Sequence, residues 1–322
     1  MTANAPGSAG ASTPLPSFSV IIPAFNAAGT LSRAIDSVLA QHGVRAEILV
    51  VDDASSDETA AVAARYGNRI RYLRQSHNQG VAAARNRGAA EACGEWLAFL
   101  DADDYFHPER LIAHARWIAD DPTIDFLTGD YCYADPEGKD LGRSLEAHPI
   151  GRALLARADD APRTLLRPEE IEEFVTDHVG DTHTLSVRRA QFLAVGGYPV
   201  GFRVCEDVHF LVRLVAASAR IGVSLLPLAT YVVHADSATR RDPVGAQVEN
   251  VRTLRDLARL AQAFPPAVRK GVARRLHAAR LNLAYALLRE HRRPAAVRSV
   301  LPSLWESPGW RTLRDTLAVI KG

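Results

Sequence analysis

The sequence predicts an α/β protein: a doubly wound, mostly parallel sheet flanked by helices and followed by a basic all-α region. Short apolar runs alternate with helix-length amphipathic segments over residues 17–130, a pattern typical of such sheets. Charge is divided along the chain. Residues 251–322 carry 15 Lys/Arg against 4 Asp/Glu, a net of +11, and residues 1–250 carry 23 against 33, a net of −10. This division indicates a separate C-terminal module.

The bulk composition is that of a globular protein. Apolar residues make up 47% and charged residues 23% of 322 residues, enough for one large domain plus an appendage. No run approaches the roughly 18 apolar residues of a membrane span, and residues 1–16 are small and polar, which predicts a disordered leader. Three cysteines without metal-type spacing indicate a reducing compartment, so we expect a cytoplasmic protein.

The first half supplies five strands and four helices in alternation. Thr30 is expected to cap the first helix, Ser56 or Asp57 the second, and Pro108 suits the first turn of the fourth. The strands are predicted at 18–22, 48–51, 70–74, 96–100 and 126–128, and the helices at 31–39, 60–66, 80–92 and 108–120.

The second half is less regular. Residues 131–168 read as loops with a short helix, and 223–233 as one or two strands broken at Pro227. Helices are predicted at 171–177, at 188–195 with Gly196-Gly197 closing it, and at 206–219. From residue 251 the pattern is helical, and residues 269–302 resemble a helical hairpin.

Polar side chains follow three of the predicted strands. Asn26 follows the first, Asp52-Asp53 the second, and Asp101, Asp103 and Asp104 the fourth. In doubly wound sheets ligands bind at the carboxyl ends of the strands, so these groups indicate one ligand associated with cations.

The three carboxylates after residue 100 suggest a metal site. In an extended chain Asp101 and Asp103 share a face while Asp104 points away, which makes Asp104 a structural hydrogen-bonding residue. Adjacent carboxylates repel unless a cation lies between them, and Mg²⁺ or Mn²⁺ prefers oxygen ligands. A polar loop or helix cap is the alternative interpretation of the same three acids.

Four motifs in this order resemble a known family. They are Val-Ile-Ile-Pro-Ala-Phe-Asn (20–26), Val-Val-Asp-Asp-Ala-Ser-Ser-Asp (50–57), Asn-Gln-Gly-Val-Ala-Ala-Ala-Arg-Asn (78–86) and Gly-Glu-Trp-Leu-Ala-Phe-Leu-Asp-Ala-Asp-Asp (94–104). Over residues 17–235 the chain closely resembles the family 2 glycosyltransferases, inverting enzymes of the GT-A fold. The resemblance implies a nucleotide-sugar-binding half at 17–130, an acceptor-binding and catalytic half at 131–240, and a basic helical region at 245–322.

The resemblance also implies which residues hold the nucleotide. Pro23, Ala24 and Asn26 match the loop that lines the nucleotide pocket. Asp53 matches the acid that accepts a hydrogen bond from the uracil ring NH, with Asp52 beside it. Thymine carries the same imide NH, so the resemblance implies a UDP-sugar or a dTDP-sugar donor.

The catalytic groups follow from the later motifs. Arg85 matches the segment that crosses the nucleotide and donor sugar, and Asp101 and Asp103 match the DxD motif. The resemblance implies that Asp101 lies nearer the ribose as a second metal ligand, and that Asp103 binds the divalent metal, Mn²⁺ or Mg²⁺, that bridges the phosphates. In the pair Glu206-Asp207, which opens a helix, Asp207 matches the catalytic base.

The closing motif departs from the family at one position. Residues 231–237 resemble its Tyr-x-x-His-x-x-Ser segment, in which His234 reaches the diphosphate or the metal. Many relatives have Arg at the position of Val232. One phosphate contact is therefore missing, and Arg240 or Arg241 is the candidate substitute.

The physical chemistry agrees with these roles. A metal on Asp103 stabilises charge on the departing nucleoside diphosphate. Asp207 is ionised at neutral pH and accepts the proton of the acceptor hydroxyl as the new bond forms. Direct in-line attack inverts the anomeric centre. The implied enzyme is a metal-dependent hexosyl- or N-acetylhexosaminyltransferase acting on a glycan, a lipid-linked or a small-molecule acceptor.

Each candidate also has a purely structural interpretation. Asp52 and Asp53 are also suited to cap the ends of strands, and Asp207 is suited to the N-terminus of a helix. His234 could be a buried core histidine, and Arg85 could form an ion pair with a neighbouring acid. His183 could be an ordinary loop residue. Two other functions stay open. A nucleotidyltransferase is disfavoured because residues 23–29 contain no Lys or Arg, and a non-catalytic nucleotide-sugar or glycan-binding module is disfavoured by the intact acids.

The basic C-terminal helices have four interpretations. They contact an anionic membrane surface peripherally, bind an acidic polymer acceptor, form a homodimer interface, or present an ordinary solvated face. Nucleic acid is not an expected partner because no reading motif accompanies the charge.

Overall fold

The computed structural model describes residues 14–158, 161–177, 180–234 and 242–321. Within them ten strands form one sheet in the order β3-β2-β1-β4-β9-β6-β10-β5, with β7 beside β6 and β8 beside β10. The strands are β1 (Ser17–Ala24), β2 (Arg45–Asp52), β3 (Arg71–Arg74), β4 (Trp96–Phe99), β5 (Tyr105–Phe106), β6 (Phe126–Ala134), β7 (Asp140–Arg143), β8 (Arg163–Leu165), β9 (Ser186–Arg188) and β10 (Ile221–Val232).

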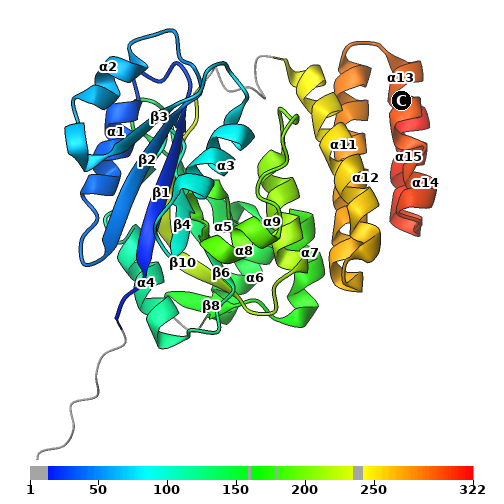
Figure 1. Cartoon of the computed structure of the whole chain (residues 1–322). Helices are drawn as coiled ribbons and strands as arrows, with labels where there is room; N and C mark the ends of the chain where they lie inside the picture. The colour runs from blue at the N-terminus through cyan, green and yellow to red at the C-terminus, as the bar shows by residue number, and fades with distance from the viewer. Residues whose placement is uncertain (1–13, 159–160, 178–179, 235–241, 322) are drawn as a thin grey trace, which may run out of the picture.

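Helices flank this sheet and form the C-terminal region (Figure 1). Those of the sheet domain are α1 (Leu31–Leu39), α2 (Thr59–Ala64), α3 (Val81–Glu91), α4 (Arg110–Asp120), α5 (Ser144–Ala147), α6 (Pro149–Arg157), α7 (Ile171–Asp177), α8 (Arg189–Ala194) and α9 (Glu206–Ala216). The C-terminal ones are α11 (Pro243–Leu260), α12 (Pro266–Arg289), α13 (Arg293–Val300), α14 (Ser303–Glu306) and α15 (Trp310–Lys321).

The parallel core of the predicted sheet is confirmed. β1 pairs in parallel with β2 and with β4, and β2 pairs in parallel with β3. Successive side chains of β1 enter different cores: Ile21 packs in one apolar cluster, and Val20 and Ile22 in the other. A strand covered on both faces is continuously apolar, which is why these runs were recognisable in the sequence.

The second half differs from its prediction in two places. β9 was not predicted, since only Arg188 of it falls in the helix expected at 188–195, and it inserts antiparallel between β4 and β6. Pro227 does not break the last strand, since β10 runs unbroken over 12 residues. The pairing of β10 with β6 shifts register on both sides of Pro227, which accommodates a residue that has no backbone NH to donate. β6 crosses the expected boundary at residue 130, so both halves share one sheet.

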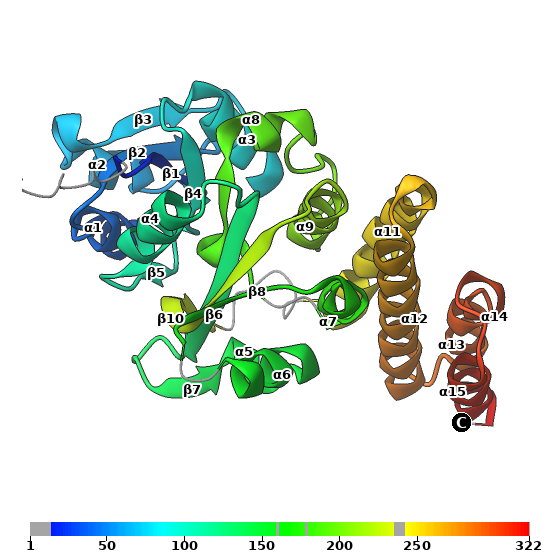
Figure 2. The same cartoon turned by 90° about the horizontal axis from the view of Figure 1, so that it is seen from below.

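The C-terminal helices pack as a layer beside the sheet domain (Figure 2). α12, with 24 residues, is the longest of them, and α11, α13 and α7 all pack against it. In the described ranges no helix combines the length and apolarity needed to cross a membrane.

Two predictions near the N-terminus, the helix cap at Thr30 and the disordered leader at 1–16, need correction. Thr30 precedes α1 as expected, but its hydroxyl bonds back to the Ala27 carbonyl and does not cap the helix. Residues 1–13 of the expected leader lie outside the described residues, while Leu15 already packs against the core.

Candidate active site

A pocket of about 790 Å³ opens at the carboxyl ends of β1, β4 and β10. β1 and β4 are neighbours in the sheet, and β9 and β6 separate β4 from β10. The ends of β1 and β4 were predicted to meet, whereas β10 takes the place expected for the end of β2. The pocket is lined by Pro23, Phe25, Asn26, Ala27, Gly29, Thr30, Arg33, Val81, Asp101, Ala102, Asp103, Pro136, Val232 and His234.

The carboxylates after β4 are presented by a turn. The Asp104 amide donates to the Asp101 carbonyl at 3.1 Å, so the segment is not extended as expected. Asp101 and Asp103 nevertheless both line the pocket, and Asp104 is buried away from it. One Asp104 carboxylate oxygen accepts from the Val232 amide at 2.8 Å, which ties the turn to the end of β10.

Asp103 and His234 meet at the pocket mouth. The Asp103 carboxylate lies 2.8 Å from the His234 Nε2. Both side chains are partly exposed, so a ligand from solvent reaches them. A carboxylate with an imidazole suits Mn²⁺, with phosphate oxygens completing the coordination. In the described part of the chain no group of three or more His, Cys, Asp or Glu side chains is arranged to hold a metal ion by itself.

Arg33 supplies a cation to the same pocket. Its guanidinium donates to the Asp103 carbonyl and lies 5.3 Å from the Tyr105 ring centre. Arg240 and Arg241, the expected substitutes for the arginine absent at Val232, lie outside the described residues. Arg33 on α1 is therefore a cation of the pocket that the sequence motifs did not reveal.

The acids after β2 lie beneath the pocket rather than in it. Asp52 is fully buried and accepts hydrogen bonds from Tyr72, Arg74 and the Ser55 amide. Asp52 does not line the pocket, so its contact with a nucleotide stays a prediction, and its observed hydrogen bonds tie it to β3 and to the loop after β2.

Asp53 is occupied in a similar way. It is 3% exposed, and its carboxylate accepts from the amides of Gln79 and Gly80, both at 2.7 Å, at the start of α3. Asp53 does not line the pocket, so a hydrogen bond donated by a uracil NH to its carboxylate stays a prediction.

The loop after β1 contributes side chains of different kinds. Pro23 and Asn26 line the pocket. Ala24 was expected to line it too, but it is buried within β1. Asn26 has a left-handed φ of 50°, and its side-chain oxygen accepts from the Ser56 amide at 2.9 Å. Phe25 is 51% exposed at the pocket wall, where its ring is free to stack on a nucleobase.

Arg85 joins the pocket to the second half of the domain. It is 3% exposed and donates to Asp101 at 2.7 Å and to Glu206 at 3.0 Å, above the ring of Tyr198. Burial disfavours the guanidinium charge, but Asp101 and Glu206 outweigh it and raise the pKa of Arg85. Burial and the adjacent Asp207 charge raise the pKa of Glu206. Arg85 thus forms the ion pair that its structural interpretation anticipated, within the site itself.

Asp207 stands at the first turn of α9, next to this ion-pair chain. Its side chain is half-buried, and Asp181 lies near enough that burial together with the Asp207 charge raises the pKa of Asp181. The preceding Cys205 has a left-handed φ of 63°, an uncommon conformation for a non-glycine residue.

The C-terminal region holds this turn in place. The Cys205 thiol contacts the Asn250 side-chain oxygen at 3.1 Å, and the Thr253 hydroxyl donates to the Val204 carbonyl at 2.8 Å. Both partners belong to α11. Residues of α11 therefore fix the backbone immediately before Asp207.

His183 lies beneath the site in the core, which corrects its interpretation as a loop residue. It is 1% exposed, packs edge-on against Tyr131, and lies 3.7 Å from the Asp104 carboxylate. Burial lowers the pKa of His183 to about 4, so it is neutral at pH 7. Burial and the charges of Asp103 and Asp101 raise the pKa of Asp104.

Sequence reasoning missed three residues of this site: Arg33, Phe25 and Asp181. Phe25 lies inside a recognised motif, and a large apolar residue in a turn was an available signal. Asp181 neighbours His183 in a segment read only as a loop. Nothing near Arg33 in the sequence indicates its partner, because Asp103 is 70 residues away.

The sequence comparison identifies the class of protein. Residues 19–163 match the model of the family described as Glycosyl transferase family 2 and belong to that family. The succinoglycan biosynthesis protein ExoO of Rhizobium meliloti (strain 1021) is 46% identical over 228 residues, which cover 68% of this chain and 61% of ExoO.

Solved structures show the same fold. S. aureus TarS 1–349 in complex with UDP-GlcNAc superposes with a TM-score of 0.65 at 19% identity, covering 94% of this chain and 88% of that one. The mannosyltransferase PcManGT from Pyrobaculum calidifontis, in complex with GDP-Man and Mn²⁺, gives 0.59 at 18% identity, covering 96% and 88%. The sheet domain therefore has the GT-A fold, with helices following it.

Proposed function

We propose that this protein is an inverting glycosyltransferase that moves a sugar from a nucleoside diphosphate sugar to an acceptor hydroxyl. The observation that carries the proposal is an arrangement of polar groups across the site, with a buried ion-pair chain at its centre. Asp103 with His234 marks one end, Asp101–Arg85–Glu206 forms the middle, and Asp207 follows at the start of α9. This arrangement supports a phosphate-binding end at Asp103 and His234 and a general base at Asp207.

The donor diphosphate is assigned to the pocket that follows β1, β4 and β10. Asp103 and His234 would hold Mn²⁺ or Mg²⁺ there, with Asp101 toward the ribose and Arg33 toward the phosphates. When bound, the metal supplies Lewis-acid stabilisation of the charge on the leaving diphosphate. Phe25 stacks on the base, and Pro23 and Asn26 complete the wall.

Asp207 is the proposed general base. Its carboxylate accepts the hydroxyl proton as the acceptor oxygen attacks the anomeric carbon, on the face opposite the leaving phosphate. An α-linked donor then gives a β-linked product. The ion pair of Arg85 with Glu206 offsets the negative charge of Glu206, which lies next to the proposed base.

The donor is proposed to be a UDP-sugar carrying a hexose or N-acetylhexosamine, with a dTDP-sugar as the nearest alternative. The complex of TarS with UDP-GlcNAc supports this choice. Because PcManGT is in complex with GDP-Man, GDP-sugars are also included in the donor screen described below. Reducing conditions for the three free cysteines favour a cytoplasmic site of action.

A screen of nucleotide sugars for metal-dependent hydrolysis tests the proposal without needing the acceptor. UDP-, dTDP- and GDP-sugars are incubated with Mn²⁺, Mg²⁺ or EDTA, and released nucleoside diphosphate is measured. We expect hydrolysis of one donor with a metal, and its loss in Asp103→Ala. A nucleotidyltransferase would instead release pyrophosphate from a nucleoside triphosphate and a sugar phosphate, and a binding module would bind without turnover.

A further inference from the structure

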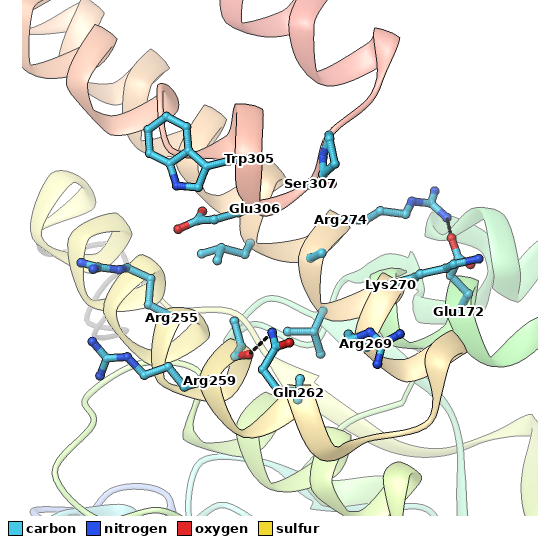
Figure 3. A pocket seen from close by; sticks show the side chains of 16 residues that line it. Glu172, Arg255, Arg259, Gln262, Arg269, Lys270, Arg274, Trp305, Glu306 and Ser307 are labelled. Atoms are coloured by element: carbon cyan, nitrogen blue, oxygen red, sulfur yellow. Dashed lines mark hydrogen bonds and ion pairs between the residues drawn. The ribbon is translucent and has the colours of Figure 1, made fainter.

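A second cavity lies in the C-terminal region, away from the donor pocket. It measures about 830 Å³, within the size range of ligand sites, and lies between α11, α12 and the segment that joins α14 to α15. Figure 3 shows arginine side chains projecting from α11 on one side and basic side chains from α12 on the other, with Trp305 above them. We call this cavity the basic groove.

The groove carries an excess of positive charge that the protein does not neutralise. Arg255, Arg259, Arg269 and Lys270 line it, are exposed, and make no ion pair with another described residue. Four unpaired cations around one hollow repel each other, so an anion placed among them is stabilised.

The two acids of the groove do not offset these cations. Glu306 accepts from Arg280 at 2.7 Å through both carboxylate oxygens, and Glu172 accepts from Arg274 at 3.2 Å. Each acid is therefore already paired, and the four cations remain available to a ligand.

The shape and the aromatic residue favour a chain of sugars over a flat surface. Trp305 is 68% exposed at the rim, and its ring offers an apolar face to sugar C–H groups. Three of the four cations are arginines, whose planar donors match carboxylate and phosphate groups. The four cations surround one hollow, which a segment of a flexible chain can enter and a flat bilayer surface cannot.

We propose that the basic groove binds a saccharide chain bearing carboxylate or phosphate groups. The site is separate from the donor pocket, so the proposal does not depend on the donor or on the base. Its consequence is that the C-terminal region holds an anionic glycan on the enzyme while the sheet domain binds the donor.

Binding of labelled oligosaccharides to the full-length protein tests this. The probes are an oligogalacturonate, a phosphate-bearing oligomannoside and a neutral maltooligosaccharide of equal length. We expect an anionic probe to bind with an affinity that falls as NaCl rises, and the neutral one to bind much more weakly. Arg259→Gln/Arg269→Gln should weaken binding about tenfold or more.

The matched control is Arg289→Gln/Arg298→Gln, which removes two exposed cations of the same region outside the groove. It should leave the affinity within about twofold, whereas Trp305→Ala should weaken it. Equal binding by the two double variants, or equal binding of neutral and anionic probes, overturns the proposal.

Two further measurements separate this proposal from its competitors. Vesicles of phosphatidylglycerol that bind through the groove, while both anionic oligosaccharides do not, would assign it to lipid and overturn the glycan assignment. Metal-dependent donor hydrolysis should be unchanged in the groove variant. Absence of hydrolysis in the wild type counts against the proposed function alone, because the oligosaccharide result is independent of it.

Discussion

Replacing Arg85 with methionine tests the ion-pair chain at the centre of the site. Methionine keeps much of the buried volume but leaves Asp101 and Glu206 facing each other without the cation. Removing one partner of a buried ion pair costs about 3–5 kcal/mol, a large part of a typical unfolding free energy of about 5–15 kcal/mol. We therefore expect a markedly lower urea midpoint for Arg85→Met.

The pH dependence identifies the cause. Burial and Asp207 already raise the pKa of Glu206, and Arg85 opposes that rise. Without Arg85 the folded-state pKa of Glu206 rises further above the unfolded value of about 4.3. A carboxyl with a raised folded-state pKa binds its proton more tightly when folded, so stability is highest at low pH and declines as pH rises through that pKa. The loss should therefore be smaller at pH 5 than at pH 8.

Two variants complete the experiment. Arg87→Met removes a partly buried arginine of the same helix α3, which donates to the Arg74 carbonyl and forms no ion pair with a described residue, and it should change the midpoint much less than Arg85→Met. Glu206→Gln in the Arg85→Met background should recover about 1–3 kcal/mol, because it removes the unpaired charge. Equal losses for Arg85→Met and Arg87→Met, or a loss independent of pH, would refute this reasoning.

Three further predictions concern activity. Asp207→Asn should lower transfer by about 10²–10⁴-fold with donor affinity kept, measured as kcat and as calorimetric binding of the donor; a normal kcat would remove the base assignment. Asn250→Ala and Thr253→Val should each lower kcat and leave donor binding unchanged, because residues of α11 fix the turn before Asp207. An unchanged kcat in both variants would show that the turn keeps its conformation without these contacts. Arg33→Ala should weaken nucleoside diphosphate binding about tenfold while leaving binding of the free nucleoside unchanged, and equal weakening of both would argue against a phosphate contact.

The first half of the fold was predictable because its signals are local. Each parallel strand, such as β1 or β4, is apolar on both faces, and each following helix has its own apolar stripe. β9 was missed because three residues that pair antiparallel with β4 and β6 carry no periodicity of their own. β10 was expected to break at Pro227, whose compensation by register shifts depends on β6.

The site was predictable as a set of strand ends but not as a set of contacts. Asp101 and Asp103 line the pocket as expected, although a turn and not strand alternation brings them there. Asp52 and Asp53 look alike in the sequence, and only their donors, the Tyr72 hydroxyl and the α3 amides among them, show that both are engaged beneath the pocket. Such partners lie 20 or more residues away and leave no local trace.

Calorimetric titration of UDP-GlcNAc into the protein, with Mn²⁺ and with EDTA, tests the central claim most directly. If Asp103 with His234 holds a metal shared with the donor diphosphate, binding should be strong with Mn²⁺, weak with EDTA, and insensitive to Mn²⁺ in Asp103→Ala. The same titration with UDP alone separates the nucleotide from the sugar. Binding of equal strength in Mn²⁺ and in EDTA, or an Asp103→Ala variant that keeps the full response to Mn²⁺, would contradict the assignment.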